Sequence, residues 1–155
     1  MVPPPKLGEL DPNSPIQPDE ILLRRVPKQG GMTPDGKAVL PNAFAPHSQI
    51  DTTGISVYRD SIHTSQQVAQ EFRGRGTQPV WVAHIRASDV IAMGLTIQPN
   101  PLMAEETPLR PAQPGHALLP EINSGNARTD VTVERKRQLA AKVFHIDGPY
   151  VPPPP

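Results

Sequence analysis

The distribution of proline is the feature that most constrains how this chain folds. The 22 prolines among 155 residues gather mainly in three parts of the chain: residues 1–20, 99–120 and 149–155. Proline fixes φ and has no amide hydrogen to donate, so it is excluded from the interior of helices and sheets. The pattern therefore predicts an extended lead-in over residues 1–18 and a polyproline tail over 148–155. Between them it predicts a single domain over 19–147, which contains a long loop at 99–115.

Apolar runs between the prolines predict the secondary structure of the domain. Six runs have the length and composition of strands: residues 21–26, 55–59, 80–86, 95–97, 116–119 and 143–146. Three segments have helical patterns: one that begins at Thr64 and ends before Gly74, one over 88–93, and one over 130–142. Thr64 and Gln67 have the spacing of a capping box. This order of elements predicts an α+β fold with a small, mostly antiparallel sheet and two or three helices.

Composition excludes several classes of protein. The chain has no cysteine, which excludes disulfides and thiol chemistry, and its 15 basic residues balance its 15 acidic residues. The basic residues of segment 130–142 are therefore best explained as a solvated helix face, and nucleic acid is not an expected partner. No apolar run is long enough to span a membrane, and the N-terminus lacks the pattern of a signal peptide. We expect a soluble protein located in the cytoplasm.

The histidines show no motif typical of a metal site. They stand at positions 47, 63, 84, 116 and 145, and no two of them have ligand spacing. The phosphate-binding motifs Gly-x-Gly-x-x-Gly and Gly-Lys-Ser/Thr are also missing from the sequence. From sequence alone we therefore predict no metal site and no obligatory cofactor.

Two adjacent arginines on the first expected strand give the clearest signal of a binding site. Arg24 and Arg25 must point to opposite faces, so one guanidinium is turned toward the sheet's core or toward a cleft. That arginine either binds an anion or forms an ion pair with Asp19, Glu20 or a C-terminal acid. Further along, Ser56 and Tyr58 share one strand face and are either ligand-binding or half-exposed, and His116 is either an acid–base group or a structural histidine at a turn.

Several short motifs resemble those of a family of small uncharacterised bacterial proteins. They span roughly residues 21–147 and comprise Leu23-Arg24-Arg25-Val26, Asn42-Ala43-Phe44, Ile55-Ser56-Val57-Tyr58, Arg86, Gln98-Pro99, Gly115-His116-Ala117 and Arg137-Gln138-Leu139-Ala140. This resemblance implies a first strand that bears arginines, a serine–tyrosine strand and a histidine–alanine strand. It implies no activity.

The order of polar residues also resembles that of ADP-ribosyltransferases and RES-type toxins, which consume NAD. In those proteins an arginine on the first strand is followed by a strand with serine or tyrosine and then by an acidic residue. The corresponding residues of this chain are Arg24 or Arg25, then Ser56 or Tyr58, then Glu71 or Glu121. The resemblance implies an arginine that binds a pyrophosphate and a carboxylate that stabilises positive charge on the ribose.

Two functions are consistent with these features. The first is an accessory protein that acts through a protein partner and has no assigned catalysis. The alternative is a protein that binds NAD or another nucleotide, in which NAD would be the only cofactor. The residues expected to bind a ligand are Arg24, Arg25, Ser56, Tyr58 and His116, and the candidates for catalysis are Tyr58, Glu71 and His116.

Overall fold

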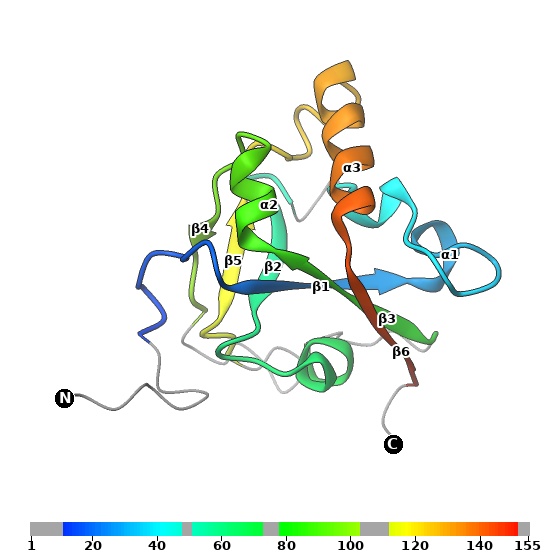
Figure 1. Cartoon of the computed structure of the whole chain (residues 1–155), viewed down its shortest axis with the longest axis horizontal. Helices are drawn as coiled ribbons and strands as arrows, with labels where there is room; N and C mark the ends of the chain where they lie inside the picture. Colours follow the sequence, from blue (N-terminus) through cyan, green and yellow to red (C-terminus); the bar gives the residue numbers. More distant parts are fainter. Residues whose placement is uncertain (1–10, 48–50, 73–77, 103–111, 152–155) are drawn as a thin grey trace.

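Six strands form one open antiparallel sheet in the computed structural model, which describes residues 11–47, 51–72, 78–102 and 112–151 (Figure 1). The order across the sheet is β4-β5-β2-β1-β3-β6. The strands are β1 (Ile21–Pro27), β2 (Ile55–Arg59), β3 (Val80–Arg86), β4 (Gln98–Pro99), β5 (His116–Leu119) and β6 (His145–Tyr150). The helical elements are α1 (Lys28–Gly31), η1 (Pro41–Phe44), η2 (Gln67–Glu71), α2 (Ala87–Ala92) and α3 (Asp130–Lys142). The predicted α+β class is confirmed.

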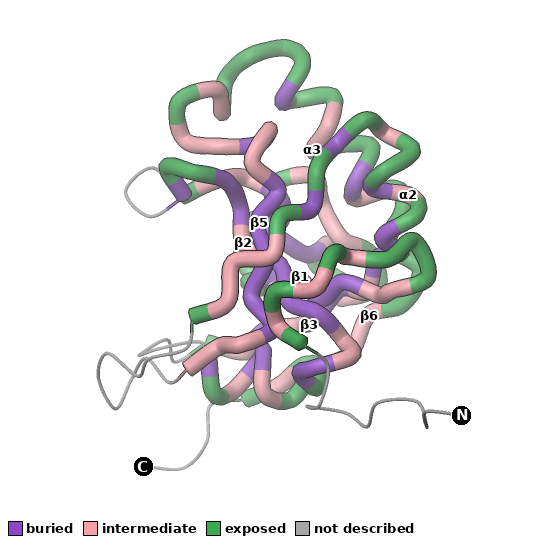
Figure 2. Tube along the Cα trace, turned by 90° about the vertical axis from the view of Figure 1, so that its left-hand side faces the viewer, coloured by how far each residue is buried: buried purple, intermediate pink, exposed green. Residues whose placement is uncertain are grey.

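Apolar side chains cover both faces of the sheet and form two cores. On β1, Leu22 and Val26 belong to the larger core, whereas Leu23 belongs to the smaller one. Figure 1 shows α2 and α3 on one side of the sheet and the η2 segment on the other. Figure 2 shows buried residues running along the central strands between these two layers. Because alternate residues of a strand point to opposite faces, each face can carry its own polar site beside its core.

The helices expected after Thr64 and over 130–142 begin where predicted, whereas the one expected over 88–93, capped by Ser88, is instead α2 (Ala87–Ala92), which follows Arg86 and has no side-chain cap. The Thr64 hydroxyl accepts a hydrogen bond from the Gln67 amide (3.1 Å), and the Gln67 side-chain oxygen accepts one from the Thr64 amide (3.0 Å). The short π-helical turn η2 follows this capping box, and Gly74, its expected end, lies outside the described residues. Helix α3 has the predicted bounds and is capped by Thr129. No helix in the described part of the chain is long and apolar enough to cross a membrane.

The edges of the sheet differ from the sequence-based expectation. The strand expected at 95–97 is instead a two-residue strand, Gln98–Pro99, at one edge. At the other edge β6 continues to Tyr150, through the start of the segment predicted to be a polyproline tail. Both errors have the same cause: an edge strand has one unpaired side, where the missing amide hydrogen of Pro99 or Pro149 has no cost.

Residues 11–18, which the sequence predicts as part of an extended lead-in, are packed against the domain. Ser14 closes a turn onto Asp11, and the Pro18 carbonyl accepts a hydrogen bond from the Ser88 amide (3.0 Å). The Arg59 guanidinium, which is only 1% exposed, donates to the Ser14 carbonyl (2.8 Å) and forms an ion pair with Glu20. This buried arginine fixes the N-terminal segment to the end of β2.

Candidate metal centre

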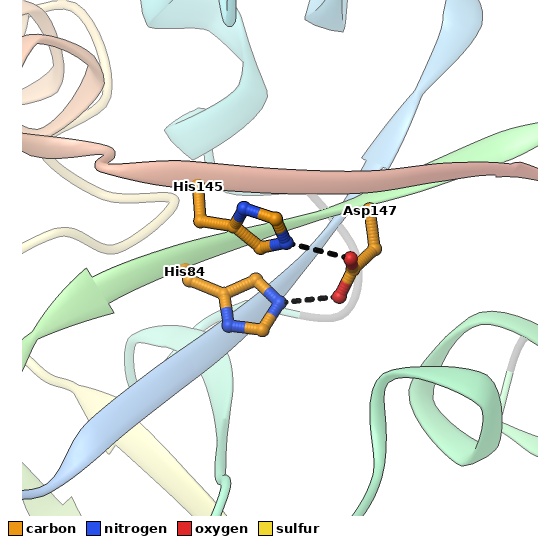
Figure 3. Close-up of side chains that lie close together, drawn as sticks. All are labelled: His84, His145 and Asp147. Atoms are coloured by element: carbon orange, nitrogen blue, oxygen red, sulfur yellow. Dashed lines mark hydrogen bonds and ion pairs between the residues drawn. The ribbon is translucent and has the colours of Figure 1, made fainter.

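The pairing of β3 with β6 brings two histidines and an aspartate together on one face of the sheet. His84 and His145 are direct partners in the antiparallel register. Asp147 lies two residues beyond His145, and side chains at this spacing share a face of a strand. One nitrogen of each histidine and one carboxylate oxygen of Asp147 all lie within 4.8 Å of one another (Figure 3).

The aspartate joins the two imidazoles. Its Oδ2 lies 2.7 Å from His84 Nε2, and its Oδ1 lies 2.7 Å from His145 Nε2. Burial raises the Asp147 pKa, but hydrogen bonds from Ser65, His145 and His84 outweigh that effect, so the pKa is lowered overall. The carboxylate is therefore charged at neutral pH and is available as an anionic ligand.

Ser65, in the η2 layer that packs against this face of the sheet, holds the Asp147 carboxylate. It precedes η2, and its hydroxyl donates to Asp147 Oδ2 (2.8 Å) and lies 3.1 Å from His84 Nε2. The capping box of Thr64 fixes the backbone next to Ser65. The η2 layer thus supplies a positioning residue for a cluster that belongs to β3 and β6.

The cluster is open to solvent on one side. The His84 side chain is 13% exposed, whereas those of Asp147 and His145 are 30% and 54% exposed. A metal ion held by these three side chains would therefore be reached by water from the His145 side. Structural zinc sites are closed by four protein ligands, whereas catalytic sites have three protein ligands and one position for water. The exposure and ligand number match the second type.

The three ligand atoms indicate which kind of ion the cluster would bind. Two imidazole nitrogens and one carboxylate suit zinc and other divalent first-row transition metals, whereas magnesium and calcium prefer oxygen ligands alone. The Nε2 atoms that now face Asp147 would have to carry lone pairs, which moves each proton to Nδ1. This requires a change of tautomer but no rearrangement of the backbone.

The structure also brings together three of the residues predicted to form a ligand site. Tyr58 and His116 are direct partners between β2 and β5. His116 Nε2 lies 2.8 Å from Ser56 Oγ, and the Tyr58 ring meets the His116 ring edge-on at 5.6 Å between centroids. The Tyr58 hydroxyl donates to Gln113 Oε1 (3.1 Å). This group, Ser56, Tyr58 and His116, is called the β2–β5 cluster below.

The two predicted arginines point to opposite faces of the sheet, and both donate to backbone carbonyls. Arg24 points to the face of the larger core, where its guanidinium donates to the carbonyls of Ala43 (3.0 Å) and Ser56 (2.7 Å), and burial lowers its pKa. Among the described residues, Arg24 forms no ion pair with Asp19, with Glu20 or with a C-terminal acid. Glu20 pairs with Arg59 instead. Arg25 lies on the other face and donates to the Phe72 carbonyl (2.6 Å). Glu71 is exposed at the end of η2.

Two buried histidines on the η2 side of the sheet are held in the neutral form. His63 Nε2 accepts a hydrogen bond from the Gly115 amide (2.8 Å), so its proton is on Nδ1, which faces Gln67. His116 Nδ1 faces the Asn100 carbonyl (3.0 Å) and must donate to it. Burial is the main cause that lowers the pKa of both groups; hydrogen bonds to Gln67 and Asn100 oppose it.

We therefore expect the protein to lose stability as the pH falls below about 6.5, the ordinary pKa of histidine. The unfolded chain takes up protons there, while the folded chain resists until the lowered pKa values are reached. The loss is at most about 1.4 kcal/mol per pH unit for each histidine. Urea unfolding at neutral pH and near pH 5, with a chelator present, measures it.

His63→Gln provides the matched test, because a glutamine oxygen can still accept the Gly115 amide but does not titrate. This variant should lose less stability between the two pH values than the wild type. Equal unfolding free energies of the wild type at both pH values would contradict this account of the two histidines.

Comparison of the chain with protein-family models, with curated proteins and with solved structures found no match. The resemblances described from the sequence therefore stay predictions. Any assignment of function depends on the geometry of the two clusters.

The cluster of His84, His145 and Asp147 is not among the sites predicted from the sequence. The available signal was the spacing of His145 and Asp147, which places both on one face if the segment is a strand. Assigning residues from 148 onward to a tail obscured how far that strand continues. His84 is about sixty residues away in the chain, and only the pairing of β3 with β6 shows that it joins them.

Proposed function

We propose that the protein binds one divalent transition-metal ion, best matched by zinc, through His84 Nε2, His145 Nε2 and the Asp147 carboxylate. The observation that supports this most strongly is the convergence of three such ligand atoms within 4.8 Å of one another, on two paired strands. The strands are covered by a packed core on the other face, so the ligands need little ordering when the ion binds.

The proposed site is of the kind that activates water. Three protein ligands leave a fourth position, and zinc lowers the pKa of a water bound there to about 7. Ser65 would hold the Asp147 carboxylate in place, as residues behind metal ligands do. The proposal is therefore a metal-dependent protein with hydrolytic capacity, and the cluster gives no indication of the substrate.

The two functions predicted from the sequence stay predictions. A protein partner is compatible with a metal site on the edge strand β6. For a nucleotide site, Arg25 is the candidate arginine, because the strand register puts it on the same face as Ser56 and Tyr58. The Arg24 guanidinium lies on the other face and is occupied by backbone carbonyls. The metal proposal needs neither of them.

Isothermal titration of the chelator-treated protein with zinc tests the proposal. We expect one ion per chain in the wild type. Each of the variants His84→Asn, His145→Asn and Asp147→Asn should weaken binding by about 100-fold or more. Removing a residue behind a metal ligand typically costs about 10- to 100-fold, so Ser65→Ala should fall in that range or slightly below it.

The controls are chosen to match the ligands in type. His47→Asn and Asp130→Asn remove an exposed histidine and an exposed carboxylate outside the cluster, and both should bind zinc like the wild type. Zinc at about 100 times its dissociation constant should also stabilise the wild type by about 2.7 kcal/mol, which raises the melting temperature by roughly 5–10 °C. A wild type that binds no zinc, or ligand variants that bind it unchanged, would refute the proposal.

A further inference from the structure

A second pair of side chains, outside the proposed metal site, has the arrangement of a nucleophile and its base. Ser56 Oγ lies 2.8 Å from His116 Nε2, and His116 Nδ1 lies 3.0 Å from the Asn100 carbonyl. A carbonyl only accepts hydrogen bonds, so the His116 proton is on Nδ1. Nε2 therefore carries a lone pair, and the Ser56 hydroxyl donates to it.

This arrangement holds the base in one orientation and one tautomer. The Asn100 carbonyl takes the part that a carboxylate takes in many serine enzymes, since it orients the imidazole through its other nitrogen. The Tyr58 ring packs against the imidazole in a T-shaped arrangement, and the Tyr58 hydroxyl is itself fixed by Gln113. His116 is only 6% exposed, so water does not compete for its nitrogens.

The serine is more accessible than its base. Ser56 is half-buried on β2, whereas His116 and Tyr58 are buried. Arg25 lies on the same face of the sheet as Ser56, whereas the Arg24 guanidinium lies on the opposite face and is bound to backbone carbonyls. An oxyanion that forms at a group attached to Ser56 would therefore have one cationic side chain, that of Arg25, on its own face of the sheet.

We propose that Ser56 is a nucleophile activated by His116 and that it accepts the acyl group of a carboxylic ester. Ser56 Oγ would form a bond to the ester carbonyl carbon as its proton passes to His116 Nε2. The bond from that carbon to the alcohol oxygen would break, and the leaving oxygen would take the proton from Nε2. Water would then release the acid from Ser56 by the same steps, with His116 accepting and returning one proton.

Reaction with diisopropyl fluorophosphate tests the proposal without a known substrate. Ser56 Oγ bonds to phosphorus and fluoride leaves, so the intact mass rises and peptide mapping locates the adduct. We expect the wild type to carry one adduct, on Ser56, and Ser56→Ala to carry none. His116→Asn keeps a donor toward the Asn100 carbonyl but removes the base, and it should react about 100-fold more slowly.

Ser61 supplies the matched control, because it is half-buried like Ser56 but its hydroxyl contacts the Glu20 carboxylate, outside both clusters. Ser61→Ala should react like the wild type. Circular dichroism shows whether each variant is folded, and adduct mapping on the wild type decides the question even if His116→Asn does not fold. The absence of an adduct at Ser56 in the folded wild type, an adduct at Ser65 instead, or an unchanged rate in folded His116→Asn would overturn the proposal. These outcomes are independent of zinc binding.

Discussion

Replacing Arg59 by methionine should lower the free energy of unfolding by about 3–5 kcal/mol, the usual cost of removing one partner from a buried ion pair. The Arg59 guanidinium makes two short contacts with the Glu20 carboxylate, at 2.8 and 2.9 Å. The Glu20 side chain is only 11% exposed, so the substitution leaves its charge largely buried without a partner. Urea unfolding followed by circular dichroism measures the loss.

Arg137 provides the matched control. It also forms an ion pair, with Glu134, but both side chains are exposed on α3, and Arg137→Met should leave the stability unchanged. The double variant Glu20→Gln, Arg59→Met should lose less than the sum of the two single losses, because the second substitution removes the unpaired charge. If Arg59→Met were as stable as Arg137→Met, the N-terminal segment would not be held in the way described.

Arg24→Met is expected to have the second largest effect, a loss of roughly 2–4 kcal/mol. The substitution leaves the Ala43 and Ser56 carbonyls buried without their donors, and an unpaired buried polar group costs about 1–3 kcal/mol. Relief from burying a charge offsets part of this cost. Thermal and urea unfolding of the variant measure the net effect.

Arg24→Lys separates the charge from the shape of the side chain. An ammonium group keeps the charge but lacks the planar fork that reaches separate carbonyls, so this variant should also be destabilised. Full stability of Arg24→Met would show that the carbonyl contacts contribute nothing. Zinc binding by either variant, measured where the protein is folded, should be that of the wild type, because Arg24 lies on the opposite face from the metal cluster.

The sequence predicted those parts of the fold that local patterns determine. Helix α3 and the capping box of Thr64 and Gln67 depend on neighbours three or four residues apart, and both are present as expected. Between β1 and β2 the sequence predicts no helix, yet this segment contains α1 and η1. The carbonyl at Ala43 in η1 is held by Arg24 from β1, a contact that no local pattern reveals.

The candidate sites also differ in how far local sequence patterns could predict them. Ser56 and Tyr58 alternate on one short strand, so the sequence could predict that they share a face. Arg24 is turned inward as one of the two arginines had to be, but its donors meet carbonyls rather than a ligand. The metal cluster depends on which distant strands pair, and on β6 continuing beyond Asp147 at a sheet edge that tolerates proline.

The most direct test of the metal proposal is a crystal structure grown with one equivalent of zinc per chain, with anomalous diffraction recorded at the zinc edge. We expect one anomalous peak at about 2.0–2.2 Å from His84 Nε2, His145 Nε2 and an Asp147 oxygen. A structure in which these three side chains keep their mutual hydrogen bonds, with zinc bound elsewhere or not at all, would contradict it.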